Sequence, residues 1–117
     1  MEGDITLNSK PVKGNVLTIN TGSTSSKFGY YVDGHLQSLG NIDHPKSEID
    51  KVPYFADQLP MRHESAIKFL HDNNVPCEDV DIIMARGGLF TPCITGIYDV
   101  NADMREVLMS GRDGKHA

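Results

Sequence analysis

Short apolar runs separated by glycine-containing turns open the patterned part of the sequence. Residues 16–19 are β-branched or apolar and predict a buried strand. The aromatic-rich residues 27–32 predict a second strand, and the Asp-Gly pair at residues 33–34 is typical of a two-residue hairpin turn. Residues 35–42 predict the return strand, with a bulge near Gly40 because its apolar positions do not alternate strictly. The pattern predicts a three-stranded antiparallel meander.

A helical period replaces the strand pattern after residue 60. Residues 43–59 contain two prolines and predict a connecting loop with one short helix at residues 47–51. Glu64 and Lys68 are spaced to pair along an exposed helix face, and residues 73–76 carry the stop signals Asn-Asn and Pro. The predicted buried stripe, spaced i, i+3, i+4 and i+7, is His63, Ala66, Ile67 and Leu70.

The last third of the chain predicts another strand and helix. Residues 80–85 are nearly continuously apolar, as in a central strand covered on both faces. Residues 96–100 predict a short strand, and Asn101 is a suitable N-cap for a helix that Gly111 would end. The apolar positions of that helix are Met104, Val107 and Leu108. The fold class is therefore α/β, a mixed sheet of an antiparallel meander and a parallel central strand with flanking helices.

Length, charge and composition narrow the class of protein. The 117 residues suffice for one domain, for which we expect residues 1–14 to form a flexible leader and residues 15–117 the structured part. A net charge of −5 argues against general nucleic-acid binding. No apolar run approaches the roughly 18 residues that a membrane helix requires, so we expect a cytoplasmic protein without a membrane partner. Cys77 and Cys93 are too far apart for a CxxC motif and are expected to be free structural thiols.

The turn between the first two strands has the composition of an anion site. It reads Asn-Thr-Gly-Ser-Thr-Ser-Ser-Lys from residue 20 to 27. Gly22 lets backbone amides approach an anion, four consecutive hydroxyls can donate to its oxygens, and Lys27 adds a positive charge. The spacing fits neither a Walker A loop nor a dinucleotide-binding loop. An ordinary polar turn has the same composition, and that alternative stays open.

A second candidate follows the predicted strand at residues 80–85. Arg86 could grip a carboxylate or a phosphoryl group, and the glycines at 87–88 would leave room for it. Alternatively, Arg86 caps carbonyl groups or pairs with an acidic surface residue. His63 and Glu64 lack the second histidine of a zinc motif and are expected on a helix face. Three further histidines are expected at solvated positions, namely His35, His44 and His71.

These motifs together resemble a known family. Residues 16–27 resemble the first hairpin of acetate and butyrate kinases, members of the sugar kinase, Hsp70 and actin superfamily. The segments at residues 85–89, 95–101 and 114–117 resemble butyrate kinases in order and spacing. The resemblance implies a ribonuclease H-like mixed sheet forming part of the first actin-like ATPase-type domain. The family usually has proline where this chain has Thr21, which affects the stiffness of the loop rather than any hydrogen-bond donor.

The resemblance also implies roles for individual residues. Arg86 would be the catalytic arginine, Asn20 would contribute to a magnesium site, and ATP or ADP with Mg²⁺ would be the cofactors. The substrate-binding residues would be Gly87, Gly88 and His116. The phosphate-binding residues would be Asn20, Gly22, Ser23, Thr24, Ser25 and Lys27.

The implied reaction moves a phosphoryl group between ATP and butyrate or a related branched acid, giving an acyl phosphate and ADP. The partners would be a short-chain carboxylic acid and ATP, and a homo-oligomer is left open. Only one residue follows His116, so we expect this chain alone to be catalytically incomplete. The alternatives are a non-catalytic phosphate- or nucleotide-binding module and a fragment of an acetate or propionate kinase.

Overall fold

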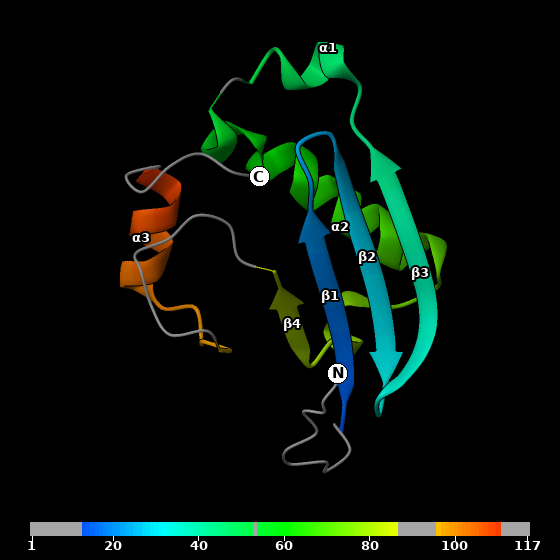
Figure 1. The fold of residues 1–117 in the computed structure, drawn as a ribbon. Coiled ribbons are helices and arrows are strands. Elements are labelled where there is room, and N and C mark those ends of the chain that lie inside the picture. The colour runs from blue at the N-terminus through cyan, green and yellow to red at the C-terminus, as the bar shows by residue number, and fades with distance from the viewer. Residues whose placement is uncertain (1–12, 53, 87–95, 111–117) are drawn as a thin grey trace, which may run out of the picture.

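A four-stranded mixed sheet organises the protein (Figure 1). The computed structural model describes residues 13–52, 54–86 and 96–110. The strands are β1 (Asn15–Thr21), β2 (Ser25–Val32), β3 (His35–Asp43) and β4 (Ile82–Ala85). Their order in the sheet is β3-β2-β1-β4, with β1/β2 and β2/β3 antiparallel and β1/β4 parallel. The predicted mixed α/β fold is confirmed, whereas its ribonuclease H-like identity and the leader at residues 1–14 remain predictions.

The β2–β3 hairpin has the predicted turn but a different bulge. Asp33 and Gly34 adopt positive φ angles of 48° and 83°, as a type I′ turn requires. The register slips between Tyr30, which opposes Ser38, and Tyr31, which opposes Leu36. The extra residue is therefore Gln37, and the prediction of a bulge near Gly40 is wrong because β3 pairs regularly with β2 on either side of Gly40.

The described helices are α1 (Lys46–Ile49), η1 (Phe55–Gln58), α2 (Leu59–Asp72), η2 (Cys77–Asp79) and α3 (Ala102–Ser110). Four of them lie between β3 and β4 in the sequence, α3 follows β4, and α2 covers one face of the sheet. The long helix α2 lies across β1, β2 and β3, and the core forms between them (Figure 1). The buried apolar side chains of this core are Leu17, Phe28, Tyr30, Phe69 and Leu70.

The inward face of α2 is rotated relative to the predicted stripe. His63 is exposed and Ile67 keeps 41% of its surface exposed, whereas Phe69 is only 4% exposed. The Phe69 ring stacks on Phe28 with ring centroids 5.3 Å apart and an interplanar angle of 22°. A Cβ on Gly40 would lie 2.6 Å from Phe69 Cδ1, so the bare backbone of β3 gives this ring its space. Burial of the large aromatic ring therefore decides which side of the helix faces the sheet.

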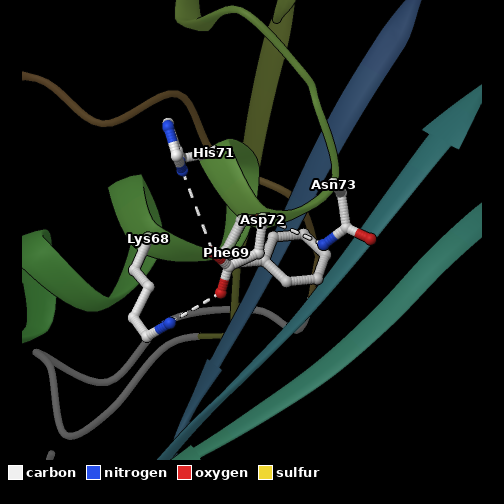
Figure 2. A network of polar contacts seen from close by, with 5 residues as sticks. All are labelled: Lys68, Phe69, His71, Asp72 and Asn73. Atoms are coloured by element: carbon white, nitrogen blue, oxygen red, sulfur yellow. Dashed lines mark hydrogen bonds and ion pairs between the residues drawn. The ribbon is translucent and has the colours of Figure 1, made fainter.

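Polar contacts close the carboxyl end of α2 (Figure 2). Asn73 Nδ2 donates to the Phe69 carbonyl oxygen at 2.8 Å. Lys68 Nζ lies 2.7 Å from Asp72 Oδ2, so the predicted pairing of Lys68 with Glu64 is replaced by one nearer the helix end. The hydrogen bond from Lys68 is the main cause that lowers the pKa of Asp72. The helix ends where the Asn-Asn signal predicts. Lys68 and Asp72 are exposed, so their ion pair adds little stability.

The strand β4 is less covered than its sequence predicts. Ile82, Ile83 and Met84 keep 43%, 63% and 38% of their surfaces exposed. The expectation of a strand buried on both faces is therefore wrong for the described residues, because α2 packs over β1 to β3 and β4 forms the edge of the described sheet.

The segment before α3 differs from its prediction, and α3 itself agrees. Residues 96–100 form no strand, because they pair with no described strand. Ile97 and Val100 in this segment are 80% and 70% exposed. Asn101 is the predicted N-cap, with its Oδ1 accepting a 2.8 Å hydrogen bond from the Met104 amide. Within the described ranges, no helix combines the length and the apolar character that crossing a membrane requires.

We expect Gly40→Ala to lower the free energy of unfolding by about 1–3 kcal/mol, because the added methyl group would overlap the Phe69 ring. Urea denaturation of the variant and the parent chain measures the difference. Leu39→Ala is the control, since Leu39 is 72% exposed on the same strand and should change stability by less than about 0.5 kcal/mol. Combining Gly40→Ala with Phe69→Leu should cost less than the sum of both changes; strict additivity would contradict the proposed contact.

Candidate functional site

The hydroxyl-rich turn lies at the carboxyl end of β1, between two strands as predicted. Thr21 and Ser26 form the last pair of the β1–β2 ladder. The Gly22 amide donates to the Ser25 carbonyl at 2.8 Å and closes the turn. Ser23 and Thr24 are exposed at its tip, whereas Gly22 and Ser25 are half-buried. The turn therefore offers backbone and hydroxyl groups to solvent at one corner of the sheet.

A guanidinium group holds this turn from the helix side. Arg62 lies on α2 and is half-buried, and its Nε donates to Gln58 Oε1 at 3.0 Å. Its two terminal nitrogens donate to four oxygens of the turn: Nη1 to Ser25 O (2.8 Å) and Ser26 Oγ (3.0 Å), and Nη2 to Gly22 O (2.8 Å) and Ser23 O (3.3 Å). The sequence analysis missed Arg62, because nothing in its local pattern points to a turn about 40 residues away.

Ser26 belongs to this support and not to the exposed surface of the turn. Its side chain is completely buried, and its Oγ lies 2.9 Å from His44 Nε2. Arg62 can only donate, so the Ser26 hydroxyl accepts from Arg62 and has its own proton available for His44 Nε2. This arrangement favours a neutral His44 with its proton on Nδ1. Of the four consecutive hydroxyls, only those of residues 23–25 remain available to an anion.

His44 is the clearest correction among the predicted residues. It was expected at a solvated position, but it is only 5% exposed, and its amide donates to the Thr24 carbonyl at 2.7 Å. Burial is the main cause that lowers the pKa of His44, the Arg62 charge lowers it further, and Asp43 acts in the opposite direction. Buried and close to a cation, His44 is held in its neutral form.

The predicted cationic residues come to the same corner of the sheet. Asn20 on β1 opposes Lys27 on β2, and both are exposed. Lys27 lies between Ser26 and Phe28, which are buried on the α2 side, so it projects from the opposite face of the sheet. Arg86 follows β4, and its amide donates to the Ile19 carbonyl at 3.0 Å, which places it beside the end of β1.

The Arg86 side chain is exposed and has no hydrogen-bond or ion-pair partner among the described residues. The alternative that Arg86 caps carbonyls or pairs with an acidic residue therefore finds no support in this part of the chain. Three predicted substrate-binding residues lie outside the described residues, namely Gly87, Gly88 and His116.

The oxygen atoms near the turn suit a metal ion that is held mainly by a bound phosphate group. Within the described ranges, no three His, Cys, Asp or Glu side chains group as a metal site. Asn20 offers an exposed amide oxygen, and residues 23–25 offer hydroxyls, a set that fits Mg²⁺ keeping most of its ligands from water and phosphate. Cys77 is a free thiol, as predicted, and it is exposed; Cys93 lies outside the described residues.

Three curated proteins are similar to most of this chain. A probable butyrate kinase of Coprothermobacter proteolyticus is 32% identical over 102 residues, which cover 87% of this chain and 29% of that protein. Butyrate kinase 2 of Clostridium acetobutylicum is 32% identical over 106 residues, covering 91% and 30%. Butyrate kinase 1 of the same organism is 35% identical over 102 residues, covering 87% and 29%.

These similarities confirm the predicted resemblance to butyrate kinases. The chain spans about 30% of the length of the curated relatives it matches. No family model matches the sequence.

The buried His44 should make stability depend on pH in a defined direction. Its pKa is lower in the folded chain than the ordinary histidine value of 6.5, so its contribution is complete above pH 6.5 and is lost as pH falls through the folded value. Urea denaturation from about pH 8 to about pH 5 should show a steeper loss for the parent chain than for His44→Gln, which removes the titration. Parallel stability curves for the two proteins would contradict this assignment.

Proposed function

We propose that the turn at residues 22–25 and the strand ends beside it form the phosphate-binding part of an ATP-dependent carboxylate kinase. The observation that carries the proposal is the meeting of this turn with Lys27 and Arg86 at neighbouring strand ends. In this reaction a phosphoryl group moves between ATP and a short-chain carboxylate, giving an acyl phosphate and ADP. The similarity to three butyrate kinases supports this reaction over a non-catalytic binding module.

The placement of the cationic groups supports a division of roles. Lys27 and the turn lie together, so we assign them to the phosphates of the nucleotide. Arg86 stands at the end of the adjacent parallel strand, where ligands of α/β sheets gather, so we assign it to the carboxylate and the transferring phosphoryl group. Phosphoryl transfer relies on positioning and on neutralising negative charge, which these two cations supply. When bound, Mg²⁺ would neutralise further phosphate charge, and the exposed Asn20 would offer it an amide oxygen.

We propose butyrate or a related branched acid as the acceptor. The names of the relatives favour butyrate over acetate or propionate. The relatives are about three times as long as the aligned part, so we also propose that these 117 residues do not complete the reaction alone.

Lys27→Ala should weaken the binding of ADP and inorganic phosphate about fivefold to tenfold, as expected when a charged hydrogen-bond donor is lost. Isothermal titration at fixed ionic strength measures both affinities. Lys68→Ala is the matched control: it removes the same charge from an exposed residue that pairs with Asp72 at the far end of α2. Equal affinities for the parent chain and Lys27→Ala would contradict the assigned role of the turn.

A hydroxamate-trapping assay with butyrate, ATP and Mg²⁺ tests the proposed incompleteness. We expect no acyl phosphate above the buffer background from these 117 residues, because the relatives devote more than two thirds of their length to segments outside the aligned region. Clear turnover would show that the chain completes the reaction by itself. Turnover with acetate and not with butyrate would instead contradict the proposed acceptor.

A further inference from the structure

Arg62 lies behind the candidate phosphate site, and its contacts with the turn are mostly with the backbone. Its Nη2 atom donates hydrogen bonds to two successive carbonyls, Gly22 O at 2.8 Å and Ser23 O at 3.3 Å. Both carbonyls therefore point toward α2. No other described residue donates to them, so the guanidinium decides the direction of two consecutive peptide groups at the tip of the turn.

The direction of the carbonyls fixes the direction of the amides. In a trans peptide the N–H points opposite to the C=O of the same group, and the described chain has no cis peptide bond. The Ser23 and Thr24 amides must therefore point away from Arg62. Neither amide has an acceptor among the described residues. Two successive unpaired amides that point the same way can donate together to one anion, and this pair of amides is called the nest below.

We propose that Arg62 is a positioning residue that builds an anion-binding nest from the Ser23 and Thr24 amides. The ligand is a phosphate group, so the inference rests on the proposed function and adds to it a mechanism of preorganisation. The amides face the side of the sheet from which Lys27 projects, so nest and ammonium group converge on one anion. Arg62 does not touch the phosphate and acts only through the turn.

The surroundings of Arg62 hold it in this position. Gln58 is only 8% exposed and accepts from Nε at 3.0 Å, which fixes the plane of the guanidinium. The buried Ser26 hydroxyl accepts from Nη1 and is itself held by His44. Lysine cannot replace Arg62 here, because all its N–H donors belong to one nitrogen atom. They cannot reach, in one plane, the oxygen atoms that accept from Nη1 and from Nη2.

The test uses the 117-residue chain and inorganic phosphate, followed by the amide NMR signals of Ser23 and Thr24. In the parent chain both signals should shift on titration. Arg62→Ala should weaken phosphate binding at least about tenfold and reduce these shifts, and Arg62→Lys should restore little of either. Guanidinium chloride at a low, non-denaturing concentration should partly restore phosphate binding to Arg62→Ala, compared with NaCl at the same concentration. It should not restore phosphate binding to Lys27→Ala.

Two further variants separate positioning from general destabilisation. Asn101→Ala removes the N-cap of α3 without touching the turn or α2, so at a temperature where it is folded it should bind phosphate as the parent chain does. Gln58→Ala releases only the Nε contact and should weaken binding less than Arg62→Ala. If Arg62→Ala does not fold, the milder Gln58→Ala variant carries the test, and its unchanged affinity would overturn the proposal.

The possible failures are distinguishable. If the parent chain binds phosphate with dependence on Lys27 while the Ser23 and Thr24 amides do not respond, the nest is wrong and the proposed function stands. If folded Arg62→Ala binds phosphate as tightly as the parent chain, the nest is likewise wrong and the proposed function stands. If the parent chain binds neither phosphate nor ADP, the proposed phosphate site fails and the nest fails with it.

Discussion

The packing of Phe69 on Gly40 and Phe28 is the contact on which the arrangement of this protein depends. The ring occupies the space that a side chain on residue 40 would fill, and it stacks on Phe28 from the neighbouring strand. A helix docked by one large ring has little freedom to rotate about its axis. Arg62 lies seven residues before Phe69, which is two helical turns, so both side chains face the sheet. The same docking that forms the core therefore brings the guanidinium beneath the β1–β2 turn.

The turn shows how one half-buried charge can serve both stability and a site. Its Gly22 and Ser23 carbonyl groups face the protein and would lack partners among the described residues if α2 carried an apolar residue at position 62. The guanidinium satisfies both of them together and also donates to Ser26, which contacts His44. The polar groups left for solvent are amides, hydroxyls and Lys27, which are all donors that suit a phosphate. The carbonyl side of the turn is thus held by Arg62, and the amide side of the same backbone is the one that we propose to bind phosphate.

The sequence by itself determined much of the local structure. The strand runs of the meander and of β4, the Asp-Gly turn and the Asn101 cap depend on neighbouring residues, and the structure confirms them. The composition of the turn and the position of Arg86 after an apolar run also pointed to one corner of the sheet, because strand ends can be read from local patterns. The family resemblance was equally a property of the sequence, and the similar butyrate kinases confirm it.

Only the tertiary structure decided which side chains are buried and which residues support the turn. The helical period fitted more than one stripe on α2, and the choice fell to Phe69 because Gly40, distant in sequence, leaves room for its ring. His44 has a polar local sequence, yet it is buried by contacts with Ser26 and Thr24. Arg62 carries no motif, and its role arises from contacts with residues 36 to 40 positions earlier. Burial and long-range hydrogen bonds depend on how α2 packs on the sheet, and no local sequence pattern determines that packing.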